Sequence, residues 1–279
     1  MTAPLLQAND LTVRIGGSTI LDSLNLTMNR GEHVGMIGAS GSGKSMFAKT
    51  VMGLLPSPAQ VSGSLRVSDL DVASASEKDL RSFRGATVAM VFQDPLSALD
   101  PLMRIGKQLE WPLAHHQHVR GRRAMRAAIN EALSGVQLPD PERVAHAFAH
   151  ELSGGQRQRV AIALALACQP DLLIADEPTT ALDVTVQAHI LDVLTQATRQ
   201  HDTALLFISH DLPVVAQMAD RIVVIEEGRI SDDVSTSNLV AADATDLSDG
   251  TRRIVEAARH LDTMMDTIQS RDDRRDNDE

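Results

Sequence analysis

Aromatic residues, cysteines and long apolar runs are scarce in this sequence, and each scarcity excludes a class of protein. Phe and Trp supply only 2% of the 279 residues and Tyr is absent, so the core has to be built from aliphatic side chains and methionine. A single cysteine, Cys168, excludes a disulfide framework. The longest apolar run, residues 160–168, falls far short of the roughly 20 residues that cross a bilayer. We therefore expect a chain that is soluble by itself and needs a partner for any role at a membrane.

Basic residues are outnumbered as well. The chain holds 26 Lys and Arg against 37 Asp and Glu, a net charge of −11, which argues against nucleic acid as a partner because a phosphate backbone would be repelled. The first ten residues lack the basic start and the apolar stretch of a signal peptide. With 43% hydrophobic residues, the composition favours one large domain, or a domain with an inserted subdomain.

One stretch carries the first functional signal. Residues 38–45 read Gly-Ala-Ser-Gly-Ser-Gly-Lys-Ser and fit the pattern G-x-x-x-x-G-K-[ST]. The apolar run before them predicts a buried strand and residues 46–55 predict a helix, a context that favours a phosphate loop over a glycine-rich turn that matches by chance. We expect Lys44 to reach the β- and γ-phosphates of a nucleoside triphosphate and Ser45 to bind Mg²⁺. The predicted nucleotide-binding residues here are Gly38, Ala39, Ser40, Gly41, Ser42, Gly43, Lys44, Ser45 and Met46.

Two acids follow a second apolar run. Residues 171–176 predict a strand that ends in Asp176 and Glu177. At the carboxyl end of such a strand the first acid would hold Mg²⁺, mostly through water, and the second would accept a proton from, or orient, the water that attacks the γ-phosphate. A solvated acidic turn is the alternative. The position of the pair downstream of a phosphate loop favours the catalytic interpretation.

A second anion-binding device is predicted at residues 152–156. They read Leu-Ser-Gly-Gly-Gln and stand directly before a helix that begins near Arg157. A hydroxyl and two glycines at a helix N-terminus suit an anion, although an ordinary helix cap has the same composition. One nucleotide cannot obviously use both this device and the phosphate loop.

The pattern of apolar runs predicts an α/β fold. Residues 11–15 and 19–28 alternate apolar and polar side chains around Gly16 and Gly17, which predicts a hairpin, and residues 63–67 add a strand. Short helical patterns separated by prolines fill the region from residue 94 onward. Apolar strands that alternate with helices indicate a parallel sheet covered on both faces. The strands of that sheet are expected at residues 33–38, 86–92, 171–176, 203–209 and 221–225, with helices at 185–200 and 212–220.

The order of these motifs resembles the nucleotide-binding subunit of ABC transporters, over residues 5–235. The elements that carry the resemblance are Gly38–Ser45, Gln93, Leu152–Gln156, Asp176–Glu177, Ala181–Asp183 and His210. The resemblance implies a P-loop NTPase (RecA-like) parallel-sheet core with an N-terminal antiparallel β subdomain and an inserted α-helical subdomain at about 94–165. Residues 1–245 would form the ATPase domain. Residues 246–279 would form a C-terminal helix and a charged tail whose composition predicts disorder.

In that family two subunits join head to tail and enclose two ATP molecules, which would explain the two devices. By resemblance, Ser153, Gly154, Gly155 and Gln156 would contact nucleotide across the dimer, and Asp183 would lie at the interface. The resemblance also assigns catalytic roles to Glu177, His210 and Gln93, and Mg²⁺ contacts to Ser45, Gln93 and Asp176. Ile15 stands where the family often has an aromatic that stacks on adenine, so the choice between ATP and GTP stays open.

Residues 93–101 and 176–187 look like the peptide/nickel import branch of the family. That branch implies a peripheral location at the cytoplasmic face of the inner membrane, with two permease subunits, a second ATPase subunit and an external solute-binding protein. It leaves the solute open among peptides, metal chelates and related small molecules, and the dimer mate could be a copy or a different subunit. An ATPase of an exporter, or a soluble ABC ATPase acting on nucleic acid or the ribosome, is the alternative function.

Several polar clusters are open to two interpretations. His115, His116 and His118 suggest a metal site, but their spacing favours a solvated loop. Trp111 suits packing or docking of a membrane subunit equally. A basic cluster favours a solvated helix face over contact with anionic lipid or a membrane subunit; it consists of Arg120, Arg122, Arg123 and Arg126. An apolar stripe at helical spacing over residues 254–268 favours packing on its own domain.

Overall fold

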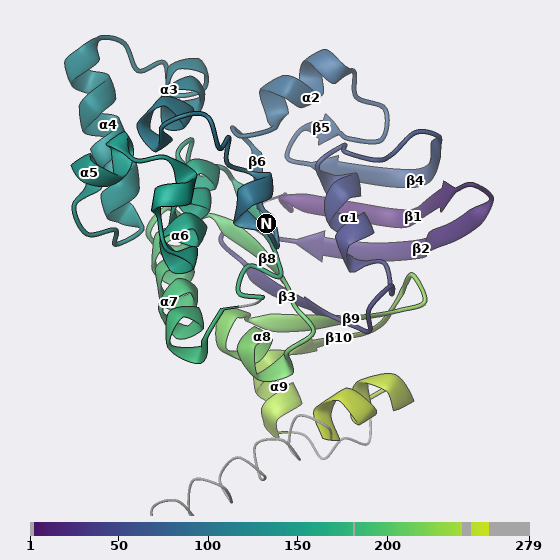
Figure 1. Ribbon diagram of the computed structural model, residues 1–279. Coiled ribbons are helices and arrows are strands. Elements are labelled where there is room, and N and C mark those ends of the chain that lie inside the picture. The colour runs from purple at the N-terminus through teal and green to yellow at the C-terminus, as the bar shows by residue number, and fades with distance from the viewer. Residues whose placement is uncertain (1–2, 181, 242–246, 257–279) are drawn as a thin grey trace, which may run out of the picture.

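The computed structural model describes residues 3–180, 182–241 and 247–256 (Figure 1). The predicted charged tail and most of the apolar stripe at 254–268 lie outside these residues. Residues 249–256 are helical, and Ile254 packs against the core. In the described part of the chain, no helix combines the length and the hydropathy needed to span a membrane.

An antiparallel sheet forms the N-terminal part of the fold. β1 (Leu6–Ile15) and β2 (Ser18–Met28) make the predicted hairpin, with Gly16 and Gly17 at φ 56° and 85° in its turn. β1 also pairs with β4 (Ala59–Val67), which continues to β5 (Leu70–Asp71), so the order is β2-β1-β4-β5. β4 begins before the predicted residue 63. The sequence analysis missed its first half because exposed polar residues there interrupt the half-buried Ala59 and Val61, so that no apolar run is visible.

A six-stranded sheet forms the centre of the molecule, in the order β10-β9-β3-β8-β7-β6. The five strands from β9 to β6 are parallel, as the sequence predicts. β10 is an antiparallel edge strand that the sequence analysis missed, because its polar, half-exposed side chains form no apolar run. The strands are β3 (His33–Ile37), β6 (Val88–Val91), β7 (Leu172–Asp176), β8 (Ala204–Ile208), β9 (Arg221–Glu226) and β10 (Arg229–Ser235).

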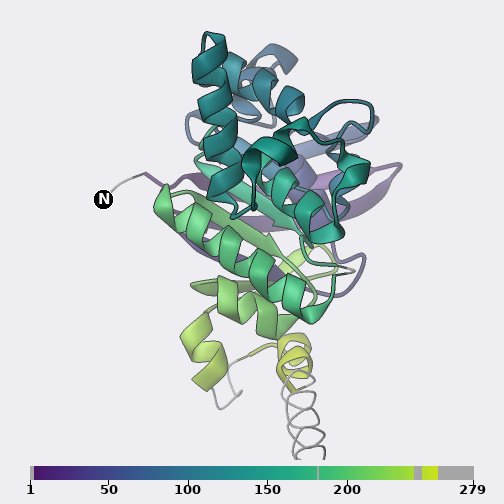
Figure 2. The same ribbon diagram turned by 60° about the vertical axis from the view of Figure 1, so that its left-hand side comes forward.

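Both faces of this sheet are covered. Successive side chains of β7 point to opposite faces, so Leu172 packs in a cluster with the antiparallel sheet while Leu173 packs in a cluster with the helices. Figure 2 shows α7 lying across the helical face. The helices against the sheets are α1 (Lys44–Val51), α2 (Glu77–Phe83), α7 (Val184–Gln200), α8 (Leu212–Met218) and α9 (Thr236–Ala241).

Between β6 and β7 the chain runs through helices that stand beside the central sheet (Figure 1). Their own contribution to the core includes Ile105, Leu133 and Val144, all fully buried. These elements are η1 (Pro95–Ser97), α3 (Ile105–His115), α4 (Arg122–Gly135), α5 (Pro141–His146), η2 (Ala149–Glu151) and α6 (Gly154–Leu166).

The first residue of β3 ties the stability of the fold to pH. His33 is 1% exposed, its Nδ1 lies 3.2 Å from the carbonyl oxygen of Met218, and its Nε2 has no hydrogen-bond partner among the described residues. Burial, reinforced by the charge of Arg199, lowers the pKa of His33 below its ordinary value of 6.5, against the opposing effects of Met218 and Asp220. The unfolded chain therefore takes up a proton that the native state resists.

We expect the free energy of unfolding to fall as the pH drops below about 6.5, because protonation of His33 then favours the unfolded state. A His33→Met variant should show a shallower fall between about pH 7.5 and 5.5, since it removes the titrating group. Urea denaturation of both proteins across this range measures the difference. Parallel pH profiles would show that His33 does not contribute.

Candidate functional site

The predicted phosphate loop connects β3 to α1. The helix begins at Lys44, and Gly43 precedes it with φ 111°. A Cβ on Gly43 would lie 2.8 Å from Cδ2 of Leu21 and 3.1 Å from the carbonyl oxygen of Ile20, so only glycine fits there. Among the described residues, no side chain caps α1. Its first N–H groups are thus free to bind an anion, and the dipole of the helix favours one.

Lys44 is folded over this loop. Its side chain is only 6% exposed, and Nζ donates to the carbonyl oxygens of Gly38 at 2.7 Å and Ala39 at 2.9 Å. Burial lowers the pKa of the Lys44 ammonium, while the nearby Glu177 and Asp176 carboxylates oppose that shift. The hydroxyl of Ser42 is buried in the same loop with no hydrogen-bond partner among the described residues. The loop therefore offers N–H groups, a hydroxyl and an ammonium to one anion.

Ser45 and Asp176 meet beside the loop. Ser45 Oγ donates to Asp176 Oδ1 at 3.2 Å, which joins the start of α1 to the end of β7. Asp176 is 9% exposed. Its burial raises the pKa of the carboxyl, the charge of Glu177 adds to this, and the hydrogen bond from Ser45 opposes it. A hydroxyl and a carboxylate are oxygen ligands that suit Mg²⁺, so the donor set fits the predicted ion.

Of the three residues predicted as catalytic, Gln93 and His210 each contact the third, Glu177. Glu177 Oε2 accepts from Gln93 Nε2 at 3.1 Å and from Thr180 Oγ1 at 3.0 Å, and its Oε1 lies 3.3 Å from His210 Nδ1. Gln93 follows β6, Glu177 follows β7 and His210 follows β8. Because these strands are parallel neighbours, their carboxyl ends bring the three side chains to one edge of the sheet.

The second predicted device sits at the start of α6. Ser153 Oγ accepts from the Gln156 backbone N–H at 3.3 Å, and Gln156 Oε1 accepts from the Ser153 N–H at 3.0 Å, a complete capping box. Ser153, Gly154 and Gly155 line a cavity of about 540 Å³ together with Asp183. None of these residues lines the cavity at the phosphate loop, among the residues that the structure describes. The structure thus groups Asp183 with this device rather than with the phosphate loop.

The cavity at the phosphate loop, of about 1160 Å³, has walls that the sequence analysis did not anticipate. Besides residues 37–42 and His210, it is lined by Asp22, Arg229, Gly250 and Arg253. Arg229 forms an ion pair with Asp22 across 207 positions of the chain, with Nη2 2.5 Å from Oδ2. No local pattern in the sequence indicates such a pairing. Ile15 packs partly buried against the core and does not line this cavity.

The histidine cluster differs from the solvated loop that its spacing suggested. His115 is the last residue of α3 and stacks on Trp111 with ring centroids 5.0 Å apart, while His116 contacts both rings edge-on. Pro112 lies inside α3, and the helix continues past it to His115. Within the described part of the chain, no group of three or more His, Cys, Asp or Glu is placed to hold a metal ion by itself.

Comparisons with known proteins agree with this geometry. A family described as "ABC transporter" matches residues 21–180. The chain is 45% identical over 246 residues to the probable D,D-dipeptide transport ATP-binding protein DdpD of Escherichia coli (strain K12), covering 86% of this chain and 75% of the relative. It is 46% identical over 241 residues to the oligopeptide transport ATP-binding protein OppD of Mycobacterium tuberculosis (strain ATCC 25618 / H37Rv), which covers 85% of this chain and only 39% of that longer relative.

Solved structures support the same conclusion. The dimeric ATP-binding cassette MJ0796, in a post-hydrolysis state with ADP and Pi, matches with a TM-score of 0.73 and 27% identity over 83% of this chain and 98% of that chain. The cbiO1 protein of Clostridium perfringens, part of an ABC transporter complex, matches with a TM-score of 0.73 and 25% identity over 94% and 99%. The α/β fold with an antiparallel N-terminal sheet is thereby confirmed as that of an ABC ATPase cassette. Since the family match spans more than half of its residues, the chain belongs to the ABC transporter family.

Proposed function

We propose that this chain is the ATP-hydrolysing subunit that powers a membrane importer of peptides or a related small solute. The observation that carries the proposal is the contact of Glu177 with both Gln93 and His210, beside a phosphate loop that offers uncapped N–H groups. Polyphosphate would bind to residues 38–46, with Lys44 exchanging its loop carbonyls for phosphate oxygens. This arrangement suits nucleotide hydrolysis.

Each residue of the candidate site has its own proposed role in ATP hydrolysis. Glu177 accepts the proton of the attacking water, and hydrogen bonds from Gln93 and Thr180 hold its carboxylate in place. His210, beside Glu177, contacts the γ-phosphate. Ser45, Asp176 and Gln93 would hold Mg²⁺, which when bound neutralises charge on the β- and γ-phosphates.

A complete site requires a second subunit. Ser153, Gly155 and Asp183 share a cavity that is separate from the one at the phosphate loop, so each chain offers half of two sites. We propose that a second ABC ATPase subunit, a copy or a different chain, places its own Ser-Gly-Gly-Gln loop over the ATP bound here. The dimeric structure of MJ0796 supports this arrangement.

The names of the relatives favour peptides as the solute. DdpD is named for D,D-dipeptide transport and OppD for oligopeptide transport, while nickel and other metal chelates stay within the same proposed class. The partners would be integral-membrane permease subunits and an external solute-binding protein. The chain would then lie peripherally at the cytoplasmic face of the inner membrane.

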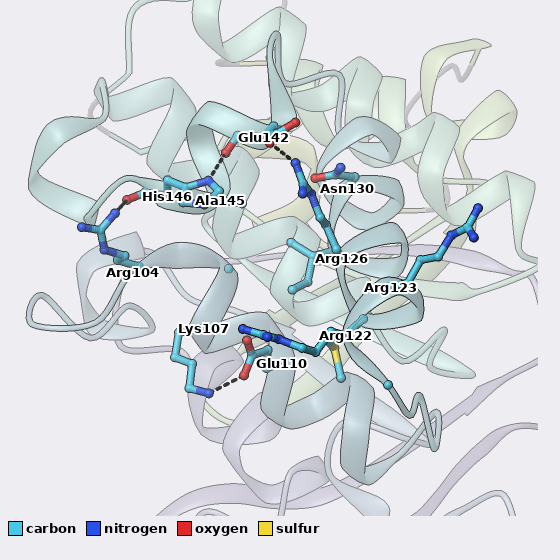
Figure 3. A pocket seen from close by; sticks show the side chains of 14 residues that line it. Arg104, Lys107, Glu110, Arg122, Arg123, Arg126, Asn130, Glu142, Ala145 and His146 are labelled. Atoms are coloured by element: carbon cyan, nitrogen blue, oxygen red, sulfur yellow. Dashed lines mark hydrogen bonds and ion pairs between the residues drawn. The ribbon is translucent and has the colours of Figure 1, made fainter.

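The docking surface for a permease subunit is proposed at the groove between α3, α4 and α5 (Figure 3). The groove encloses about 980 Å³, and five cationic side chains outnumber its two carboxylates. Lys107 pairs with Glu110 and Arg126 with Glu142, but Arg122 and Arg123 form no ion pair with any described residue. Trp111, on the same helix as Lys107, is 66% exposed. Exposed aromatic and unpaired cationic side chains suit a partner segment that carries carboxylates.

Substitution of Glu177 by glutamine should leave ATP binding intact and slow hydrolysis about a hundredfold or more, because the amide cannot accept the proton from water. The closed dimer should accumulate, which size-exclusion chromatography with ATP detects alongside phosphate release. Thr180→Val, which removes only one hydrogen bond to Glu177, is the matched control with a smaller loss. Near-normal turnover of Glu177→Gln in the assembled complex would reject Glu177 as the catalytic base.

Substitution of Lys44 by alanine should weaken ATP binding itself by about tenfold or more, because it removes a charge-assisted hydrogen bond to phosphate. Calorimetric titration of the purified chain measures the affinity. Lys49→Ala, at an exposed position on the same helix, controls for the loss of a cation. If Lys44→Ala binds ATP with unchanged affinity, the assignment of residues 38–46 as the phosphate-binding loop is wrong.

Reversal of charge at Arg122 and Arg123 to glutamate should release the chain from its membrane complex while ATP binding stays unchanged. The reason is that the reversed charges repel the carboxylates proposed on the partner. Co-purification from solubilised membranes measures the assembly. Arg66→Glu, on the distant strand β4, is the matched control. Full assembly of the double variant would place the permease contact elsewhere on the chain.

A further inference from the structure

Residues 247–256 return to the central sheet and are anchored on its edge strand β10. Asp232 accepts a hydrogen bond from the Ser248 backbone N–H at 3.2 Å, and its other carboxylate oxygen accepts one from the Thr251 hydroxyl. Thr251 is completely buried and Val255 is almost completely buried. The Ser248 hydroxyl also accepts from the Thr251 N–H at 3.2 Å, which caps the helix of this segment. Residues 247–256 are therefore packed and hydrogen-bonded as part of the domain.

One face of this helix forms a wall of the cavity at the phosphate loop. Gly250, Arg253 and Ile254 line that cavity together with residues 38–42, and their spacing of three and four places them on one side of the helix. Gly250 brings the helix against the end of β9, since a Cβ there would lie only 1.4 Å from Glu226 Oε1. The close approach at Gly250 holds Arg253 at the cavity.

The charge of Arg253 is uncommitted within the described structure. It forms no ion pair and no hydrogen bond with any residue described, whereas Arg229, the other arginine of the cavity wall, is paired with Asp22. Lys44 is bound to its own loop. Glu226 and Glu227 also line the cavity and carry the opposite sign. Arg253 is thus the available guanidinium on that wall, and a guanidinium matches the geometry of phosphate oxygens.

We propose that Arg253 is a nucleotide-contacting residue that binds a phosphate group of the nucleotide held by the phosphate loop. This inference rests on the proposed function, because it requires ATP to bind at residues 38–46. Nucleotide binding at the phosphate loop would thus be coupled to the docking of residues 247–256 on the domain. By linkage, the nucleotide then stabilises the docked segment to the same extent that the docked segment tightens nucleotide binding.

Calorimetric titration of the purified full chain with ATP, ADP and AMP in the presence of Mg²⁺ tests the contact. Arg253→Ala should raise the Kd for ATP about 5- to 50-fold, the loss expected for one exposed charge-assisted hydrogen bond. Arg253→Lys should recover part of the affinity. Arg252→Ala removes a cation from the same helix but not from the cavity wall, so its Kd should stay within about twofold of wild type.

Hydrogen exchange measures the same coupling from the side of the segment rather than from the side of the nucleotide. Saturating ADP should slow amide hydrogen exchange in residues 247–256 of the wild-type chain, and this protection should be lost in Arg253→Ala. Asp232→Asn, which weakens the anchor, should raise the Kd in the same direction as Arg253→Ala.

Two results would overturn the inference, and Lys44→Ala separates them from failure of the proposed function. If Lys44→Ala loses binding while Arg253→Ala keeps wild-type affinity and protection, then ATP binds at the loop and Arg253 does not contact it. If Arg253→Ala keeps its affinity but loses the ATP-dependent dimer in a Glu177→Gln background, then the guanidinium contacts the second subunit and the nucleotide contact is wrong. Wild-type binding by Lys44→Ala would instead reject the nucleotide site itself.

Discussion

The common edge at which β3, β8, β7 and β6 end is the constraint on which the candidate site depends. These strands are parallel neighbours in a single sheet, and Ile208 at the end of β8 pairs with Met36 of β3 and with Asp176 of β7. The residues that follow each strand therefore emerge side by side. Gln93 and Glu177 come together across 84 positions of the chain only because the sheet brings their strands together. Any change that shifts the register of these strands moves the proposed catalytic groups apart.

Burial at this edge sets the electrostatic character of the site. Lys44 and Asp176 are both nearly inaccessible, and burial shifts the pKa of each toward the neutral form, downward for the ammonium and upward for the carboxyl. Their mutual attraction opposes both shifts. A polyphosphate and a divalent cation would offer these two buried groups partners of opposite sign, which would make their charged forms favourable. The burial of Lys44 and Asp176 therefore favours nucleotide binding, although it does not favour the stability of the fold when no nucleotide is bound.

The sequence predicted the parts of the molecule that carry local patterns. The fully buried strands β3, β7 and β8 read as apolar runs, and the phosphate loop is specified by glycines that its geometry requires, such as Gly43. It could not predict β10, whose polar, half-exposed side chains form no apolar run, nor the pairing of Asp22 with Arg229, which lie 207 positions apart in the chain. The sequence analysis did not identify Arg253 as a site residue for the same reason. Its position at the cavity depends on the hydrogen bonds between its segment and Asp232 rather than on its neighbours in sequence.

The loop at the start of α6 has the fixed geometry that the proposed contact with a second chain's nucleotide requires. The hydroxyl of Ser153 accepts a hydrogen bond from the Gln156 N–H, and an accepting hydroxyl can still donate its own hydrogen. The capping box fixes that hydroxyl at a helix N-terminus, where the dipole also favours an anion. Gly155 lies so close to Val186 that a Cβ would be 2.8 Å from its Cγ1, which packs the loop against α7 and Asp183. The Ser153–Gln156 half of a proposed site is thus already formed in the single chain, so closing of the proposed dimer would not require this loop to fold.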